Sequence, residues 1–256
     1  MMDDRGVSET LGYVLIFSLV VTTAATGFTL GTTELSNTQQ QAKLTNVERA
    51  FDVLADNLGD VHRHEDPRRA TEIRLADGTI AVGDETNVTV GLYDESADTF
   101  VDPANNSTTF EFHPIRYHSD GTTISYEAGA VVRSSPKGGI MLSEPAFLTN
   151  ESRVVLPFIV TEPDADTTSV GGTDTVLVVG KRGPRVVPRE IDPDGSTVAV
   201  RINSSRAEVW ERYFERHDDF TVDDSAGGTD SVTATLDTSD AEMVVVARSY
   251  VSVEFR

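Results

Sequence analysis

An uncharged run near the N-terminus, from Thr10 to Thr33, constrains this chain more than any other feature. A helix rises 1.5 Å per residue, so a run of this length covers the roughly 30 Å hydrocarbon thickness of a bilayer. The run therefore predicts a membrane-spanning helix over residues 10–33, preceded by a short charged head at 1–9. Its defining positions are Leu11, Tyr13, Val14, Leu15, Ile16, Phe17, Leu19, Val20, Val21, Gly27 and Gly31.

A removable secretory signal is the alternative interpretation of the same run. Such signals have a basic head, an apolar region of about 7–15 residues and a small-residue cleavage site. Ala24-Ala25-Thr26 resembles a cleavage site, but the head Met1–Glu9 is net acidic and the run is longer. These features favour a retained span.

Small residues continue through the second half of the run, where Gly27 and Gly31 stand four positions apart. Glycines at this spacing let a second membrane helix approach closely, although the pattern is also common in helices that stay alone. Self-association and an ordinary span both remain open.

An amphipathic pattern follows the uncharged run without any proline. Apolar residues recur every three or four positions, which is typical of a helix with one buried face. The pattern predicts a stalk helix over 34–66, and one rod of about 75 Å from Leu11 to Val61. Its apolar stripe needs cover from its own domain or from a neighbouring copy, and consists of Leu44, Val47, Phe51, Leu54, Leu58 and Val61.

This arrangement resembles a type IV pilin: a short charged head, one apolar N-terminal helix, its amphipathic continuation and a β-rich remainder. The phrase Arg5-Gly6-Val7-Ser8-Glu9-Thr10-Leu11-Gly12 is similar to the N-terminal segment of haloarchaeal pilin-like membrane proteins. The resemblance implies that a dedicated peptidase removes the head between Gly6 and Val7. It also implies a cell-surface role, with copies of the chain or other pilin-like subunits as partners besides the lipid bilayer.

The charge balance supports an exterior protein of a salt-loving organism. Acidic residues number 42 against 21 basic ones, for a formal net charge of −21. Such a field repels phosphate backbones, so we expect no nucleic-acid partner. Acidity spread along the whole chain keeps a protein hydrated where salt shortens the Debye length. Arg5 on the short side indicates a cytoplasmic N-terminus and an extracellular C-terminal domain.

Alternation with a period of two begins near Ala70 and predicts about ten short strands. We expect an α+β fold in which an extracellular, mainly antiparallel, sandwich-like domain spans 67–256. One short helix interrupts the strands: Ser205 and Glu208 form a capping box, and Trp210, Tyr213 and Phe214 pack on the sheet. The predicted strands lie near 72–75, 79–82, 87–90, 109–112, 122–132, 153–160, 175–179, 197–202, 232–236 and 243–255.

Five asparagine sequons exceed the number that we expect by chance in a Thr-rich chain. Each asparagine is followed two positions later by Ser or Thr, which is the N-glycosylation signal of exterior proteins. Asn105 and Asn106 are adjacent, so both cannot readily carry a glycan. The candidate sites are Asn87, Asn105, Asn106, Asn150 and Asn203.

Motifs for catalysis are missing from the sequence: it has no nucleophile elbow, no zinc-protease motif and no phosphate loop. Cysteine is absent, which excludes disulfides and thiolate ligands. His62 and His64 stand two apart at a helix end and face different directions, so we interpret them as solvated. We interpret the acidic segments 192–196 and 218–224 as turns rather than Ca²⁺ sites. We therefore expect no enzyme activity, cofactor, metal or small-molecule substrate.

Two functions fit these observations. One is a pilin-like structural or interaction protein, and the other is a monomeric, membrane-tethered binding module. They differ in the cover that they predict for the Leu44–Val61 stripe, which packs on neighbours in a filament and on its own domain in a tethered monomer.

Overall fold

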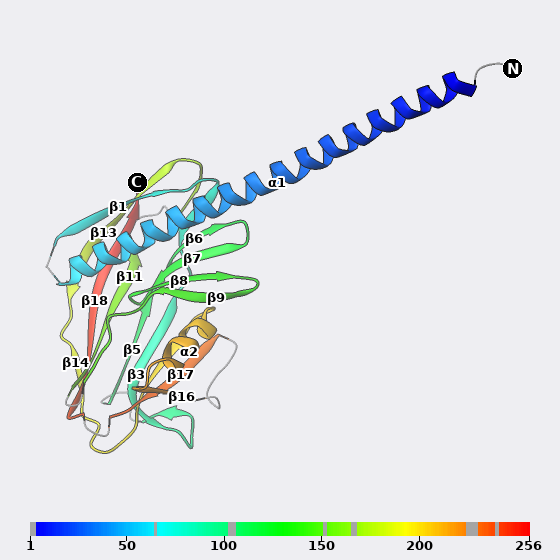
Figure 1. Cartoon of the computed structure of the whole chain (residues 1–256). Helices are drawn as coiled ribbons and strands as arrows, with labels where there is room; N and C mark the ends of the chain where they lie inside the picture. Colours follow the sequence, from blue (N-terminus) through cyan, green and yellow to red (C-terminus); the bar gives the residue numbers. More distant parts are fainter. Residues whose placement is uncertain are drawn as a thin grey trace. The chain divides into compact units, whose positions relative to one another are not determined.

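The computed structural model describes residues 4–63, 66–101, 106–150, 153–164, 168–223, 230–238 and 241–256, without side chains at 4–10, 29–37, 62 and 150. The chain divides into two compact units, Met1–Asn46 and Val47–Arg256. Each unit is described by itself below (Figure 1).

The first element is the α-helix α1, Asp4–Arg63. No proline interrupts it, and its residues match the predicted helix over 10–33 and most of the predicted stalk over 34–66. The described helix ends at Arg63, four residues before Pro67, which disfavours helical conformation in the residue before it. The first unit holds α1 as far as Asn46, and the remaining turns belong to the second unit.

The second unit is rich in β-structure, and its described residues form three sheets of six strands. In the first sheet, β1 (Arg68–Arg74), β13 (Thr175–Arg185), β18 (Met243–Phe255), β11 (Arg153–Pro163) and β10 (Leu148–Asn150) lie in that order, and β14 (Arg189–Ile191) also pairs with β18. β11 and β18 run parallel. The other described pairs are antiparallel, which confirms the coarse α+β prediction.

The second sheet is a run of neighbouring strands in the order β12 (Ser169–Gly172), β2 (Gly78–Val82), β6 (Ile115–Ser119), β7 (Thr122–Glu127), β8 (Ala130–Ser135) and β9 (Gly138–Ser143). The third has the order β16 (Phe220–Val222), β17 (Ser231–Leu236), β15 (Val198–Asn203), β3 (Thr86–Asp94) and β4 (Thr99–Phe100), with β5 (Ser107–Phe112) paired to β3.

One cluster of buried apolar residues joins strands of the first and third sheets. Leu156 and Val246 come from the first sheet, and Val90 and Val200 come from the third. The alternating strand pattern places such residues on one face of each sheet. Burial of this shared face stabilises the unit, at roughly 25 cal/mol per Å² of apolar surface removed from water.

The single strand predicted over 122–132 is wrong, because the structure has a hairpin there. β7 ends at Glu127, and the chain turns at Ala128 and Gly129, both with positive φ (51° and 99°). Two central residues in the left-handed region suit a tight hairpin whose twist matches its strands. Alanine rarely adopts this conformation, so the sequence gives only Gly129 as a turn signal.

The capping box predicted at Ser205 and Glu208 is also wrong. Helix α2 spans Ala207–Glu215, and Arg206 occupies its N-cap position without a side-chain cap. The aromatic face of α2 is confirmed as a packing face. Trp210, Tyr213 and Phe214 are buried in the shared core, which offers their rings no contact with solvent.

Candidate functional site

Large apolar side chains cover the outside of α1 in the first unit. The segment Leu11–Phe28 is long and apolar enough to cross a membrane, and none of it is buried. A signal sequence near an N-terminus passes the same test. The exposed side chains are the ones predicted to meet lipid, namely Leu11, Tyr13, Val14, Leu15, Ile16, Phe17, Leu19, Val20 and Val21, together with Phe28.

The threonines in this segment direct their hydroxyl groups back to the helix. Thr22 Oγ1 donates to the Ser18 carbonyl at 2.7 Å, and Thr23 Oγ1 donates to the Leu19 carbonyl at 2.8 Å. Thr26 makes the same bond to Thr22. A hydroxyl without a partner is costly in hydrocarbon. These bonds therefore make a Thr-rich helix compatible with lipid.

Two glycines in the upper part of α1, Gly12 and Gly27, leave an open surface. A Cβ added at Gly12 or Gly27 would meet no atom within 4 Å. The backbone of Gly6, Val7 and Gly31 belongs to α1, but their surroundings lie outside the described side chains. The predicted close approach at Gly27 and the predicted cleavage after Gly6 therefore stay predictions.

The apolar stripe of α1 is covered by the chain itself within the second unit. Phe51 has no exposed surface, and Leu54, Leu58 and Val61 are 1% exposed. Gly180 on β13 leaves space for this face, because a Cβ there would come within 2.5 Å of Leu58. Val47 is also buried, and Leu44 lies in the other unit.

Polar contacts fix the same stretch of helix. Glu48 accepts a hydrogen bond from Arg133 Nη1 at 2.7 Å, across a separation of 85 residues. Asn57 donates through Nδ2 to Thr71 Oγ1 at 2.9 Å. Oδ2 of Asp60 lies 3.6 Å from Nη2 of Arg69. The end of α1 is thus held at several points by distant parts of the chain.

A row of carboxylates runs along the outer side of this stretch. Glu48, Asp52 and Asp56 follow one another at intervals of four, so they are neighbours on the helix surface. Partial burial, and then the charges of Asp56 and Glu48, raise the pKa of Asp52. Asp52 and Asp56 are exposed, whereas the carboxylate of Glu48 is paired with Arg133.

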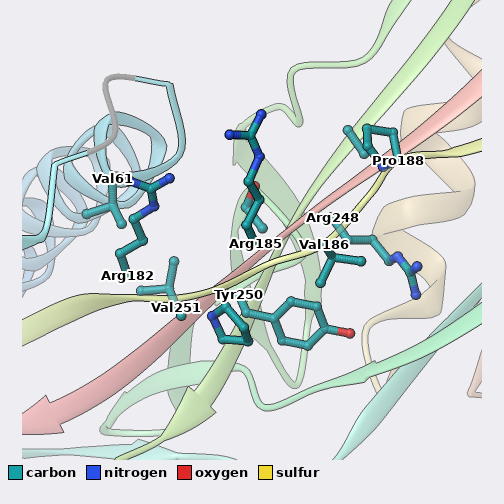
Figure 2. A pocket seen from close by; sticks show the side chains of 12 residues that line it. Val61, Arg182, Arg185, Val186, Pro188, Arg248, Tyr250 and Val251 are labelled. Carbon is teal, nitrogen blue, oxygen red and sulfur yellow. The ribbon is translucent and has the colours of Figure 1, made fainter.

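A pocket of about 200 Å³ lies where β13 separates from β18. Arg182 pairs with Val251 and Arg185 pairs with Ser249, with a register shift between the two pairs. Pairing resumes at β14, where Arg189 stands opposite Val246. The stretch from Arg182 to Arg189 therefore has more residues than the stretch of β18 that it faces, and such bulges often lie beside functional sites. We call this cavity the arginine pocket (Figure 2).

Three arginines and no acidic residue line the arginine pocket among the residues that the structure describes. Partners in an antiparallel pair point to the same face of a sheet. Arg182 and Arg185 therefore share a face with Ser249 and Val251. The complete lining is Val61, Arg182, Gly183, Pro184, Arg185, Val186, Pro188, Ala247, Arg248, Ser249, Tyr250 and Val251.

Arg248 and Tyr250 belong to the other face of β18, because successive strand residues alternate. The Arg248 guanidinium lies 6.0 Å from the ring centroid of Phe110, a core residue. Figure 2 shows the head groups of Arg182 and Arg185 on one side of β18, and Arg248 and Tyr250 on the other.

Two of the predicted sequons meet in the structure. Asn87 on β3 and Asn203 on β15 are 116 residues apart in sequence, yet Nδ2 of Asn203 donates to Oδ1 of Asn87. Both are partly buried, as is Asn106, the residue before β5. Asn105 lies outside the described residues, and only the backbone of Asn150, in β10, is described.

The remaining candidate motifs lie in a helix end, in turns and in one strand. Residues 218 and 219 form a turn, but β16 occupies Phe220–Val222, so the interpretation of 218–224 as a turn is wrong for these residues. His62 stands in the last turn of α1 with its side chain undescribed, and His64 lies outside the described residues. Asp192 Oδ1 accepts from the backbone N–H of Asp194 at 3.1 Å, as expected for a turn. The part of the chain that the structure describes holds no group of three side chains able to bind a metal.

The arginine pocket was not predicted from the sequence. One signal was present: residues 175–189 contain Lys181, Arg182, Arg185 and Arg189 but no acidic residue. In a chain with twice as many acidic as basic residues, such a segment indicates a local reversal of charge.

Together, these features define a class of protein with an exposed apolar N-terminal helix ahead of a β-rich unit, without a recognisable catalytic centre in the described residues. The chain belongs to a family of unknown function, DUF7289, whose model matches residues 5–254. Comparison with curated proteins and with solved structures found no match.

Proposed function

We propose that this chain is a membrane-anchored, pilin-like structural or interaction protein at the surface of a halophilic archaeon, without catalytic activity. The head is cytoplasmic, the helix spans the bilayer once, and the β-rich unit is extracellular. The observation that carries the proposal is the segment Leu11–Phe28, whose apolar side chains are exposed and whose threonine hydroxyls are satisfied within the helix.

Retention of this segment is favoured over removal as a signal. Cleavage near Ala25 would fall in the middle of α1, which continues to Arg63. The last turns of that helix are part of the core of the second unit, through Phe51 and Leu58. The core shared by the first and third sheets also supports a sandwich-like extracellular domain.

The second candidate is a monomeric, membrane-tethered binding module. One observation favours it: the stripe from Val47 to Val61 is covered by its own unit and is not left for neighbours. In that case, filament packing would have to use the upper part of α1. The arginine pocket supplies a place on the β-rich unit at which a binding module would hold a ligand.

Cysteine crosslinking in native membranes separates these two functions. The chain contains no cysteine, so each introduced thiol is unique. Phe17→Cys and Gly27→Cys test the upper helix, and Asp52→Cys on the exposed lower helix serves as a control. Disulfide-linked dimers at Phe17 or Gly27 alone support assembly of copies through the apolar helix. Monomers at all three positions, in carbonate-washed membranes, support the tethered module.

A further inference from the structure

We propose that the arginine pocket binds a ligand carrying two or more oxyanion groups, such as a polycarboxylate or a polyphosphate, held by Arg182 and Arg185. This site is independent of the membrane role, because all of its lining residues lie in the second unit.

The first argument is the charge of the lining. The protein carries a formal charge of −21, yet Arg182 and Arg185 line one side of this cavity, and no carboxylate is among its described lining residues. Within a cleft lined by one sign of charge, the field is focused and the local concentration of counter-ions rises.

The second argument is chemical. A guanidinium presents a planar fork of donors that matches a carboxylate or a phosphate, and bonds between ionised groups are stronger than neutral ones. Ser249 lies on the same face as Arg182 and Arg185 and adds a hydroxyl. Arg182, Arg185 and Ser249 also have interactions within the chain, and the proposal rests on their common face.

The third argument concerns the spacing of the charges. In Figure 2, the head groups of Arg182 and Arg185 lie on the same side of β18. Two guanidinium groups present two forks of donors, and one compact monovalent anion occupies one fork. A ligand with several oxyanion groups meets both, and the second contact then forms at a high effective concentration.

The backbone gives the pocket its shape. A Cβ at Gly183 would come within 2.8 Å of the Tyr250 carbonyl oxygen, so glycine is needed where the bulged segment crosses β18. Pro184 has no N–H to donate, which keeps this segment from pairing as a regular strand. The opening is therefore built into the sequence of the segment, and ligand entry needs no rearrangement of the sheet.

Equilibrium dialysis of the full-length protein in nanodiscs tests the site. Radiolabelled citrate, pyrophosphate and acetate are compared at one KCl concentration, and the comparison is then repeated at higher KCl concentrations. We expect saturable binding of citrate or pyrophosphate, at least tenfold tighter than that of acetate, and weaker binding as KCl rises. Preference for citrate identifies carboxylates as the ligand groups, and preference for pyrophosphate identifies phosphates.

The variant R182Q/R185Q should bind the preferred probe at least tenfold more weakly. The matched control R74Q/K137Q removes two exposed charges elsewhere and should bind like the wild type. R185K keeps the positive charge but loses the planar fork of donors. Its affinity for the probe should lie between those of the wild type and R182Q/R185Q. Thermal unfolding reports whether each variant is folded. Equal binding by R182Q/R185Q and wild type, an equal loss in the control, or no saturable binding of either probe overturns the proposal.

Discussion

The carboxylate of Glu127 accepts hydrogen bonds from Nε and Nη2 of Arg206 at 2.9 and 2.7 Å, and both side chains are buried. Trp210 Nε1 and Ser204 Oγ donate to the same carboxylate, at 3.0 and 3.2 Å. This network joins the end of β7 to the start of α2. A buried charge is tolerated only when it is paired and hydrogen-bonded in this way.

Removing Glu127 should therefore be strongly destabilising. We expect Glu127→Ala to lower the free energy of unfolding by about 3–5 kcal/mol, because Arg206 is left buried without its partner. Urea unfolding of the full-length protein in detergent, followed by Trp210 fluorescence, measures this change. The control Glu208→Gln alters an exposed carboxylate on α2 and should change stability by less than about 0.5 kcal/mol. A loss below about 1 kcal/mol for Glu127→Ala would contradict the role of the network.

Packing of the lower helix against its own unit gives a second prediction. Phe51→Ala should lower the free energy of unfolding by about 3–5 kcal/mol, because the ring has no exposed surface. Val53, two residues further along the same helix, is 51% exposed. The free energy of unfolding of Val53→Ala should stay within about 0.5 kcal/mol of the wild-type value. Similar losses in both variants, in the same unfolding assay, would mean that the stripe is not the buried face.

Glu254 gives the protein a pH-dependent stability. Hydrogen bonds from Arg256 and then from Lys181 lower the pKa of Glu254 from an ordinary 4.5 to about 2. A carboxyl with a lowered folded-state pKa stabilises the fold above its unfolded pKa. That contribution is complete above pH 4.5 and is lost as the pH falls to about 2.

Glu254→Gln isolates this contribution. The variant should unfold at a lower urea concentration than wild type at pH 7, and the difference should shrink between pH 4.5 and 2.5. Asp77→Asn, a change at an exposed turn, controls for a general loss of acidic charge. A difference that stays constant over this pH range would rule out the ion pairs as its cause.

The hydrogen bond between Asn203 and Asn87 limits glycosylation at these two sequons. Nδ2 is the atom that a glycan modifies, and in Asn203 this atom already donates to Asn87. We expect glycopeptide mass spectrometry to find at most one asparagine of this pair modified in any one molecule. Peptides from single molecules that carry glycans at both positions would contradict the pairing. Asn106 serves as the reference sequon, because it lies outside the pair.

Local patterns in the sequence predict the helical parts of this fold well. The uncharged run and the stripe through Phe51 and Leu58 are periodic over short distances, so both appear in α1 as predicted. The aromatic face around Trp210 is predicted for the same reason. The start of α2 is not predicted correctly, because the Arg206 side chain binds Glu127, 79 residues away, and no local cap forms.

Long-range pairing explains what the sequence does not show about the candidate site. The arginine pocket depends on the register of Arg182 against Val251, and on a bulge before Arg185 pairs with Ser249. Residues in these pairs are far apart in the chain, and no local pattern encodes the shift. Only the excess of basic residues over 175–189 was visible, and it does not place the charges on one face.

Retention of Leu11–Phe28 in the mature protein is the central claim of this account. The direct measurement is the intact mass of the protein from carbonate-washed membranes, compared in cells with and without the prepilin-type peptidase. In cells with the peptidase, we predict the mass of a chain whose N-terminal residue is Val7. In cells without it, we predict the mass of a chain that starts at Met1 or Met2. An N-terminus close to Ala25 in both strains, on a protein released by the carbonate wash, would contradict the membrane anchor.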